Sequence, residues 1–384
     1  MHMAQRSFRC FRTMNISRTL RLFSKHLKSP KSHNSYSTEK PSWPRKIFSG
    51  IQPTGSLHIG NYLGAISRWV ELQNSGEDVT YCIVDLHSIT LPQDPIRLRE
   101  NILNMTAALL ACGIDPKKST LFLQSDVKQH AELGWILGCH TTMARLSHLP
   151  QFKEKSSKIK EIPLGLFVYP VLQAADILLY KASHVPVGED QVQHLQLAQH
   201  LAKTFNTKFG ATFPHCHALV ANDLSNRIKS LRDPSKKMSK SDSDPKSTIY
   251  LTDSPDTVAD KVKKAITDFT SEVTFDPEVR PGVSNLITIH SLMSGKSPEE
   301  ICAMNTDVDT GKYKARVAEA VVEHLNPIRM RIEAFSRHPE YLSQVLEEGA
   351  QRASEIAETT IQEVKEKLGL GRLRAPKSRK SLEN

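Results

Sequence analysis

Short apolar runs alternate with amphipathic segments through the first half of the chain. Residues of β-forming type fill 47–48, 80–84, 120–123 and 185–187, and polar or glycine-containing turns bound each run. Asp94 and Pro95 predict the start of a helix, and Gly113 predicts its end. Alternation of strand and helix, with strands that are apolar throughout, predicts an α/β fold: a Rossmann-like parallel sheet covered on both faces.

From residue 254 onward the pattern indicates helices only. We expect Asp256 to cap a helix whose inward face carries Val258, Val262, Ala265 and Phe269, and Gly369 to end the last helix. The predicted organisation is a leader (1–40), a Rossmann-like catalytic domain (41–245) with a mainly helical insertion at about 131–180, a helical domain (246–371) and a disordered basic tail (372–384).

Charge is distributed unevenly. Residues 1–40 hold nine Lys/Arg and one acid, residues 372–384 hold five and one, and the body between them has a net charge of −2 out of a total of +10. Basic composition is therefore no evidence for nucleic-acid binding, and a surface that binds RNA must be a local patch. The Arg- and Ser-rich leader, nearly free of acids, is typical of a mitochondrial transit peptide, although a disordered basic tail is the alternative. No stretch reaches the ~20 apolar residues of a membrane span.

Six scattered cysteines form no CxxC pair, which argues against a zinc site, an iron–sulfur cluster or a disulfide framework and indicates a reducing compartment. We predict no protein-bound metal. Cys216 stands between His215 and His217. Because three adjacent side chains do not easily converge on one ion, we expect a polar surface loop there.

The segment 46–66 reads as a strand, a glycine-rich turn and the start of a helix. Such a turn can place backbone N–H groups and a helix N-terminus against a phosphate. Gly60 is followed by Asn61 and Tyr62 rather than by Lys and Ser/Thr, so a Walker A loop is excluded.

A second segment, Lys237-Met238-Ser239-Lys240-Ser241, carries two lysines in a polar loop. Alone, such a loop is most often a solvated surface turn. Next to a nucleotide, two mobile ammonium groups could stabilise charge that develops on a leaving phosphate.

Asp176 is the one acid in the apolar stretch 169–180. A buried carboxylate is costly without a donor, so it either reaches solvent, pairs with an unseen Lys or Arg, or meets a ligand. Tyr169, Gln173 and the segment 188–191 add polar groups near the end of a predicted strand, where open α/β sheets bind ligands. A carboxylate that only accepts suits an amino acid that carries one donor: an indole N–H or a tyrosine hydroxyl.

His58-Ile59-Gly60-Asn61 resembles the HIGH signature of class I aminoacyl-tRNA synthetases, with Asn61 in place of the second histidine, and residues 237–241 match the KMSKS loop of these enzymes. Together with IFSGIQPTG, QFKEKS, YPVLQAADILLY and VPVGEDQVQH, these motifs resemble the tryptophanyl-tRNA synthetase family, and with the leader its mitochondrial form. The resemblance spans about residues 46–371. It implies a class I synthetase Rossmann-like core, an all-α anticodon-binding domain and a homodimer in the mitochondrial matrix.

The implied reaction is ATP-dependent activation of L-tryptophan and its transfer to tRNA-Trp, with Mg²⁺ carried by the nucleotide and no other cofactor. Matching the motifs residue by residue implies catalytic roles for His58, Lys155, Lys237 and Lys240. The implied tryptophan-binding residues are Phe48, Tyr169, Gln173, Asp176 and Gln191. The implied ATP-binding residues are Gln52, His58, Ile59, Gly60, Asn61, Gly188, Glu189, Asp190, Ile228, Lys237, Met238, Ser239, Lys240 and Ser241. Two alternatives stay open: a tyrosyl-tRNA synthetase, and a non-catalytic RNA-binding paralogue.

Overall fold

The structure is a computed structural model that describes residues 43–149, 152, 160–188, 191–220, 228–240 and 242–371. The predicted leader, the basic tail, Lys155, Glu189, Asp190 and Ser241 lie outside the described residues. The described residues, from Trp43 onward, form one compact unit.

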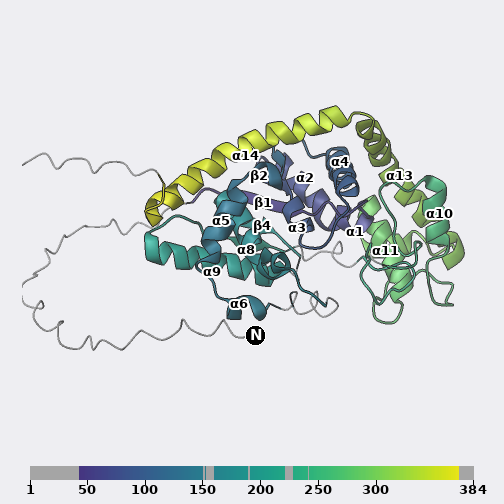
Figure 1. The fold of residues 1–384 in the computed structure, drawn as a ribbon. Helices are drawn as coiled ribbons and strands as arrows, with labels where there is room; N and C mark the ends of the chain where they lie inside the picture. The colour runs from purple at the N-terminus through teal and green to yellow at the C-terminus, as the bar shows by residue number, and fades with distance from the viewer. Residues whose placement is uncertain are drawn as a thin grey trace, which may run out of the picture. The chain divides into compact units, whose positions relative to one another are not determined.

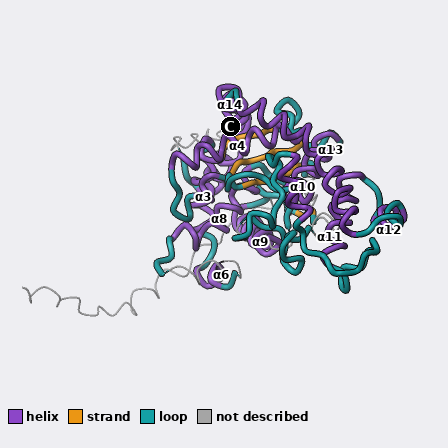
Figure 2. The backbone as a smooth tube through the Cα atoms, turned by 90° about the vertical axis from the view of Figure 1, so that its right-hand side faces the viewer, coloured by secondary structure: helices purple, strands orange, loops and turns teal. Residues whose placement is uncertain are grey.

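A five-stranded parallel sheet lies at the centre of the described chain (Figure 2). The strands, in the spatial order β3-β2-β1-β4-β5, are β1 Lys46–Ile51, β2 Asp78–Ile83, β3 Thr120–Leu123, β4 His184–Pro186 and β5 His217–Leu219. Phe48 of β1 pairs with Thr80 of β2, and Ile47 pairs with His184 of β4. The strand order reverses between β1 and β4, and this switch point is where open α/β sheets form their ligand crevice. The predicted parallel sheet is confirmed.

Helices and short helical turns connect these strands, and the elements after β5 are all helices (Figure 1). Before β5 they are α1 Ile59–Asn61, η1 Tyr62–Ile66, α2 Ser67–Asn74, α3 Asp85–Ser88, α4 Pro95–Cys112, η2 Gln124–Asp126, α5 Gln129–Gly138, α6 Met143–Ser147, α8 Leu164–Leu179 and α9 Val192–Phe209. After β5 they are α10 Pro255–Lys263, α11 Pro281–Ser294, α12 Pro298–Ala303, α13 Thr310–Ser336 and α14 Pro339–Leu368. No helix in these described ranges is both long enough and apolar enough to cross a membrane.

The predicted helix ends of α4 are confirmed. The Asp94 carboxylate accepts a hydrogen bond from the backbone N–H of Arg97 at 2.8 Å, and Pro95 is the first helical residue. Gly113 follows the helix with a φ of +112°, a conformation that a side chain would strain. Sequence chemistry at the two ends therefore fixes this element locally.

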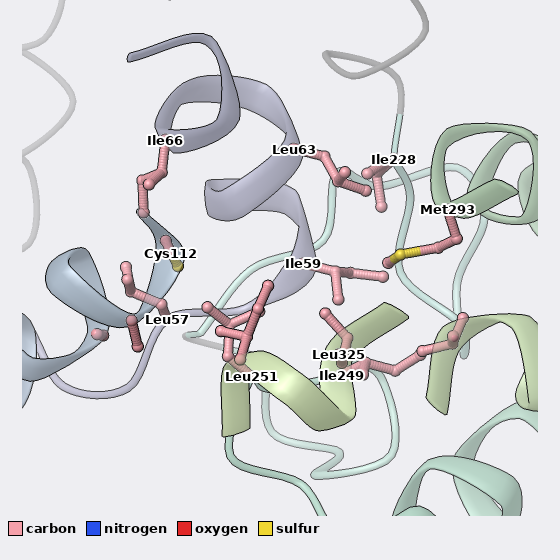
Figure 3. Packing of buried hydrophobic residues seen from close by; sticks show 14 of the residues in the cluster. Leu57, Ile59, Leu63, Ile66, Cys112, Ile228, Ile249, Leu251, Met293 and Leu325 are labelled. Atoms are coloured by element: carbon pink, nitrogen blue, oxygen red, sulfur yellow. The ribbon is translucent and has the colours of Figure 1, made fainter. Parts of the chain in front are cut away.

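Two hydrophobic cores hold the sheet and helices together. The first includes residues of α1, η1, α4, α10, α11 and α13, and the second includes residues of α5, α8, α9 and α14. Figure 3 shows Leu63 beside Ile228 and Ile59 close to Leu325 in the first core. The segment that carries the HIGH-like motif is therefore packed directly against residues from the C-terminal third of the chain.

Helix α14 returns to the sheet and packs on β3. A Cβ atom at Gly349 would lie 1.8 Å from the carbonyl oxygen of Leu121, so the helix backbone touches the strand. Ala353, Ala357 and Ile361 are fully buried in the second core. The helices after residue 246 thus share both cores with the sheet, and the domain division at 245/246 stays a prediction.

Three details differ from the sequence expectations. Ser254, not Asp256, caps α10, because Pro255 takes the first helical position and the Ser254 hydroxyl accepts from the N–H of Thr257 at 3.2 Å. The helix ends at Lys263, so Phe269 does not face inward but is fully exposed. Residues 215–217 do not form a polar surface loop, because His217 begins β5 and Cys216 is completely buried.

Candidate active site

A cavity of about 470 Å³ opens at the carboxyl ends of β1 and β4, at the switch point of the sheet. The turn after each strand contributes to its lining, through Gln52 and Gly188. Helix α8 contributes from the other side. All five residues predicted to bind the amino acid line this one cavity: Phe48, Tyr169, Gln173, Asp176 and Gln191.

Asp176 lies at the wall of the cavity and is 2% exposed. Its Oδ2 accepts a hydrogen bond from His87 Nε2 at 2.8 Å, and its Oδ1 accepts from His130 Nδ1 at 2.6 Å and from Gln124 Nε2 at 2.7 Å. The carboxylate is therefore shielded from solvent and, among the described residues, pairs with no Lys or Arg, which were two of the alternatives. Its donors are two histidines and an amide.

These donors decide the protonation of Asp176. Burial alone would raise the pKa of this carboxyl, but the hydrogen bonds from His130 and His87 outweigh burial and hold the pKa well below its usual range. The carboxylate is ionised at neutral pH and can only accept hydrogen bonds. Each of the two ring nitrogens that face it must therefore carry a proton.

A second polar group joins α8 to the start of α9. Tyr169 Oη is 3.2 Å from His194 Nε2, and His194 Nδ1 is 3.0 Å from Gln191 Oε1. Gln173 Nε2 donates to the same Gln191 oxygen at 3.3 Å. The structure thus connects three predicted residues through His194, which is 2% exposed.

The HIGH-like motif builds its own short helix start. His58 Nδ1 accepts from the backbone N–H of Asn61 at 3.3 Å, and the Asn61 side chain accepts from the backbone N–H of His58 at 3.3 Å. A Cβ atom at Gly60 would lie 3.0 Å from the His58 ring, so a side chain there would push the imidazole away. Asn61 therefore has a structural part, since it closes the reciprocal cap of α1.

The His58 imidazole is neutral. Burial, together with the neighbouring positive charges of Lys240 and Lys237, lowers its pKa to about 4. Because Nδ1 accepts from Asn61, the proton of the neutral ring lies on Nε2. His58 can thus donate a hydrogen bond to a phosphate oxygen, but it adds no positive charge.

The KMSKS loop lies beside the glycine-rich turn of the first motif. Lys240 Nζ donates to the carbonyl oxygens of Gly55 at 3.2 Å and Thr54 at 3.4 Å. Met238 is buried, and its N–H donates to the carbonyl oxygen of Ile228 at 3.2 Å, which anchors the loop. Lys240 is partly buried, and burial lowers its pKa to about 8. The Lys237 side chain is exposed.

The predicted tryptophan-binding residues all line the cavity, whereas only some of the predicted ATP-binding residues do. Within the described ranges, Gln52 and Gly188 line it, whereas His58 of the HIGH-like motif and Lys240 of the KMSKS loop are not part of the lining. Sequence reasoning did not identify His87, Gln124, His130 and His194. His87 and Gln124 each follow the carboxyl end of a parallel strand, β2 and β3, and this position is the sequence signal that could have found them.

Comparisons with known proteins agree with this geometry. The family model for class I tRNA synthetases (W and Y) matches residues 40–326. The chain is 48% identical over 326 residues to the tryptophan–tRNA ligase of Caldanaerobacter subterraneus, covering 85% of this chain and 98% of that one. It is 46% identical over 328 residues to the tryptophan–tRNA ligase of Bacillus anthracis, covering 85% and 99%.

Solved structures give the same result. Tryptophanyl-tRNA synthetase from Mycoplasma pneumoniae is similar with a TM-score of 0.76 at 34% identity, over 85% of this chain and 98% of that one. The Campylobacter jejuni enzyme, solved in complex with ADP and tryptophan, has a TM-score of 0.73 at 35% identity, over 85% and 100%. The chain belongs to the class I tRNA synthetases, in the family of the tryptophan–tRNA ligases.

Proposed function

We propose that this protein activates L-tryptophan with ATP and transfers the tryptophanyl group to tRNA-Trp. The observation that carries the proposal is the ionised Asp176 carboxylate in the wall of a cavity that Phe48 also lines, next to the turn that holds Lys240. An acceptor in an apolar wall selects an amino acid with one donor, and the adjacent lysine selects a polyphosphate. The Campylobacter jejuni relative, solved with ADP and tryptophan, supports an adenine nucleotide and tryptophan as the two ligands.

In the proposed first step, the tryptophan carboxylate attacks the α-phosphorus of ATP. The bond from that phosphorus to the bridging oxygen breaks, and pyrophosphate leaves with the electron pair. Lys237 and Lys240, with Lys155, would stabilise the charge that grows on the leaving group, and neutral His58 would donate one hydrogen bond. Mg²⁺ would arrive with the nucleotide and neutralise phosphate charge.

In the proposed second step, the terminal ribose hydroxyl of tRNA-Trp attacks the adenylate carbonyl and AMP leaves. Tyr169 and Gln191 would hold the tryptophan ammonium group during both steps. No side chain needs to become a covalent nucleophile, because positioning and electrostatic stabilisation suffice for this chemistry. Discrimination would come from the buried acceptor, since a substrate that leaves a buried polar group unpaired is rejected by up to ~10⁴–10⁵.

The setting of the reaction is part of the proposal. Residues 246–371 would bind the anticodon arm, and two copies of the chain would form a homodimer. The leader, with nine Lys/Arg and one acid in 40 residues, would direct the protein to the mitochondrial matrix. The family match begins at residue 40, so residues 1–39 of this leader lie outside it.

ATP–pyrophosphate exchange with each of the twenty amino acids tests the function. We expect exchange with tryptophan alone. Exchange with tyrosine alone would replace the substrate, and no exchange with any amino acid would favour a non-catalytic RNA-binding paralogue. Charging of a tRNA-Trp transcript by the same preparation tests the second step.

A further inference from the structure

A buried chain of polar groups lies behind Asp176, outside the cavity lining. Tyr180 Oη is 2.8 Å from His130 Nε2, and His130 Nδ1 is 2.6 Å from Asp176 Oδ1. The side chain of His130 is completely buried, and Tyr180 is 3% exposed. Neither residue is among those that line the cavity, whereas Asp176 is.

The direction of each hydrogen bond follows from the ionised carboxylate. Asp176 can only accept, so His130 Nδ1 donates to it. Burial raises the pKa of the Tyr180 hydroxyl far above its usual value, so the phenol keeps its proton. A neutral ring with its proton on Nδ1 satisfies both contacts: Tyr180 donates to Nε2, and Nδ1 donates to Asp176.

The same logic orients Gln124. Its Nε2 must face the carboxylate, which leaves its buried Oε1 without a partner among the described residues. An orphaned buried acceptor costs free energy, and the site tolerates this cost. The side-chain N–H of Gln124 therefore donates to Asp176.

The two oxygens of the Asp176 carboxylate have different hydrogen-bond partners. Oδ1 accepts from His130 and Gln124, neither of which lines the cavity, while Oδ2 accepts from His87, which does line it. A carboxylate oxygen has two lone pairs, so Oδ1 is saturated and Oδ2 keeps one acceptor position. The carboxylate cannot rotate without breaking two short hydrogen bonds at Oδ1.

We infer that His130, held by Tyr180, is a positioning residue that fixes the Asp176 carboxylate with Oδ2 ready to accept the donor of the substrate. This inference rests on the proposed function. It adds a residue to amino-acid selection that does not itself touch the amino acid. A His130 that only fills space would stabilise the fold without affecting the choice of substrate.

Two amide substitutions separate the nitrogens of His130. His130→Asn places an amide N–H near the position of Nδ1 and keeps a donor for Asp176, whereas His130→Gln places its amide near Nε2 and removes that donor. The probe is β-(3-benzothienyl)alanine, which has nearly the shape of tryptophan but carries sulfur where the indole has N–H. The measured quantity is the ratio of kcat/KM for tryptophan to that for the probe.

We expect the ratio to fall about tenfold in His130→Gln, because the charge-assisted hydrogen bond from the substrate becomes as weak as an ordinary one. In His130→Asn the ratio should stay within about threefold of wild type. Tyr180→Phe keeps the stacking on Phe48, with ring centroids 5.5 Å apart, and removes only the hydroxyl. It should reduce the ratio less than His130→Gln does. The KM for ATP should not change in any variant.

The outcomes are distinguishable. If both amino acids lose activity together and the ratio is unchanged in His130→Gln, His130 is purely structural and the inference is overturned. A wild-type ratio in Tyr180→Phe, which should fold in any case, would overturn the part given to Tyr180. A wild-type enzyme that activates no tryptophan would instead remove the proposed function, before any variant is compared.

Discussion

Lys240 Nζ donates a hydrogen bond to the carbonyl oxygen of Gly55 at 3.2 Å, across 185 residues of sequence. This contact joins the KMSKS loop to the segment that carries the HIGH-like motif. Lys240 comes from the KMSKS loop, and Gly55 lies in the turn just before the HIGH-like helix start. In this arrangement the ammonium group is bonded to backbone oxygens, and it must leave them to reach a phosphate.

The first prediction follows from the charge of Lys240. In Lys240→Ala the adenylation rate should fall, because the positive charge of Lys240 is proposed to stabilise the leaving pyrophosphate. The loss of transition-state stabilisation should be about 2 kcal/mol or more, as when an oxyanion-hole donor is removed. Tryptophan binding should change much less. Single-turnover adenylation in a rapid-quench experiment measures the first, and equilibrium titration with tryptophan measures the second. The same rate as wild type would refute the assignment. Lys237→Ala should behave in the same way.

A pH dependence follows from the burial of the same group. Its pKa of about 8 lies below the usual value of 10.5, so the free enzyme loses this positive charge as pH rises through about 8. We expect kcat/KM for ATP to fall on the alkaline side with that midpoint. His58, with a pKa of about 4, stays neutral above pH 5 and adds no limb there.

Lys240→Arg is the matched variant for this pH profile. A guanidinium does not lose its proton in the accessible range, so the alkaline limb near pH 8 should disappear even if the overall rate is lower. A limb that persists unchanged in this variant would assign the titration to another group.

Much of the fold could be predicted because local chemistry determines it. Helix α4 has Asp94, Pro95 and Gly113 at its ends, and β3 has the bounds that its apolar run predicts. Strand β5 was missed because it has three residues, the first of which is an exposed histidine. Phe269 continues the helical spacing of the apolar residues Val258, Val262 and Ala265, and this spacing predicts that it faces inward. The helix ends at Lys263, before Phe269 is reached.

From the sequence, the site could be predicted only where a single residue differs clearly from the residues around it. Asp176 is conspicuous as the lone acid of an apolar helix. Its partners His87, Gln124 and His130 precede it by 89, 52 and 46 residues and come from three different segments. They meet because β2 lies beside β1 and β3 lies beside β2 in the sheet, and nothing in the sequence around any one of them specifies that order.

The packing of α14 on β3 can be tested at Gly349. A methyl group there would overlap the carbonyl oxygen of Leu121, so Gly349→Ala should destabilise the protein by about 1–3 kcal/mol, the usual cost of overpacking. Gly138 in α5 is the matched control, because a Cβ at that position meets no atom within 4 Å. Thermal denaturation should show a lower midpoint for Gly349→Ala only. Equal midpoints for the two variants would contradict direct contact between helix and strand.

The leader can be tested apart from catalysis. A fluorescent protein fused to residues 1–45 should enter mitochondria, because basic residues and scattered apolar ones drive import. The matched control replaces Arg18 and Arg21 by Glu and should stay in the cytosol. Removal of residues 1–40 should leave the purified enzyme active. A native fusion that stays cytosolic would remove the mitochondrial part of the proposal.

Asp176→Asn tests amino-acid selection, and the surrounding donors make its outcome specific. Gln124 and His130 both donate to Oδ1, so the one oxygen of an asparagine should turn toward them. Its NH₂ group then takes the place of Oδ2, where His87 and the cavity lie. There the indole N–H would meet a donor in place of an acceptor.

The substitution should therefore remove a charge-assisted hydrogen bond worth about 1.5–3 kcal/mol and put a repulsive contact in its place. Phenylalanine never makes this bond, so the preference for tryptophan over phenylalanine in pyrophosphate exchange should fall by at least tenfold. Tyrosine, whose hydroxyl can accept from the new NH₂, should lose least or gain. ATP binding should be unaffected, since we propose that this residue contacts the amino acid and not the nucleotide. Because the variant keeps the size of the side chain and most of its hydrogen bonds, loss of folding does not explain such a change. Unchanged discrimination would mean that Asp176 only holds the buried histidines and that the substrate is selected elsewhere.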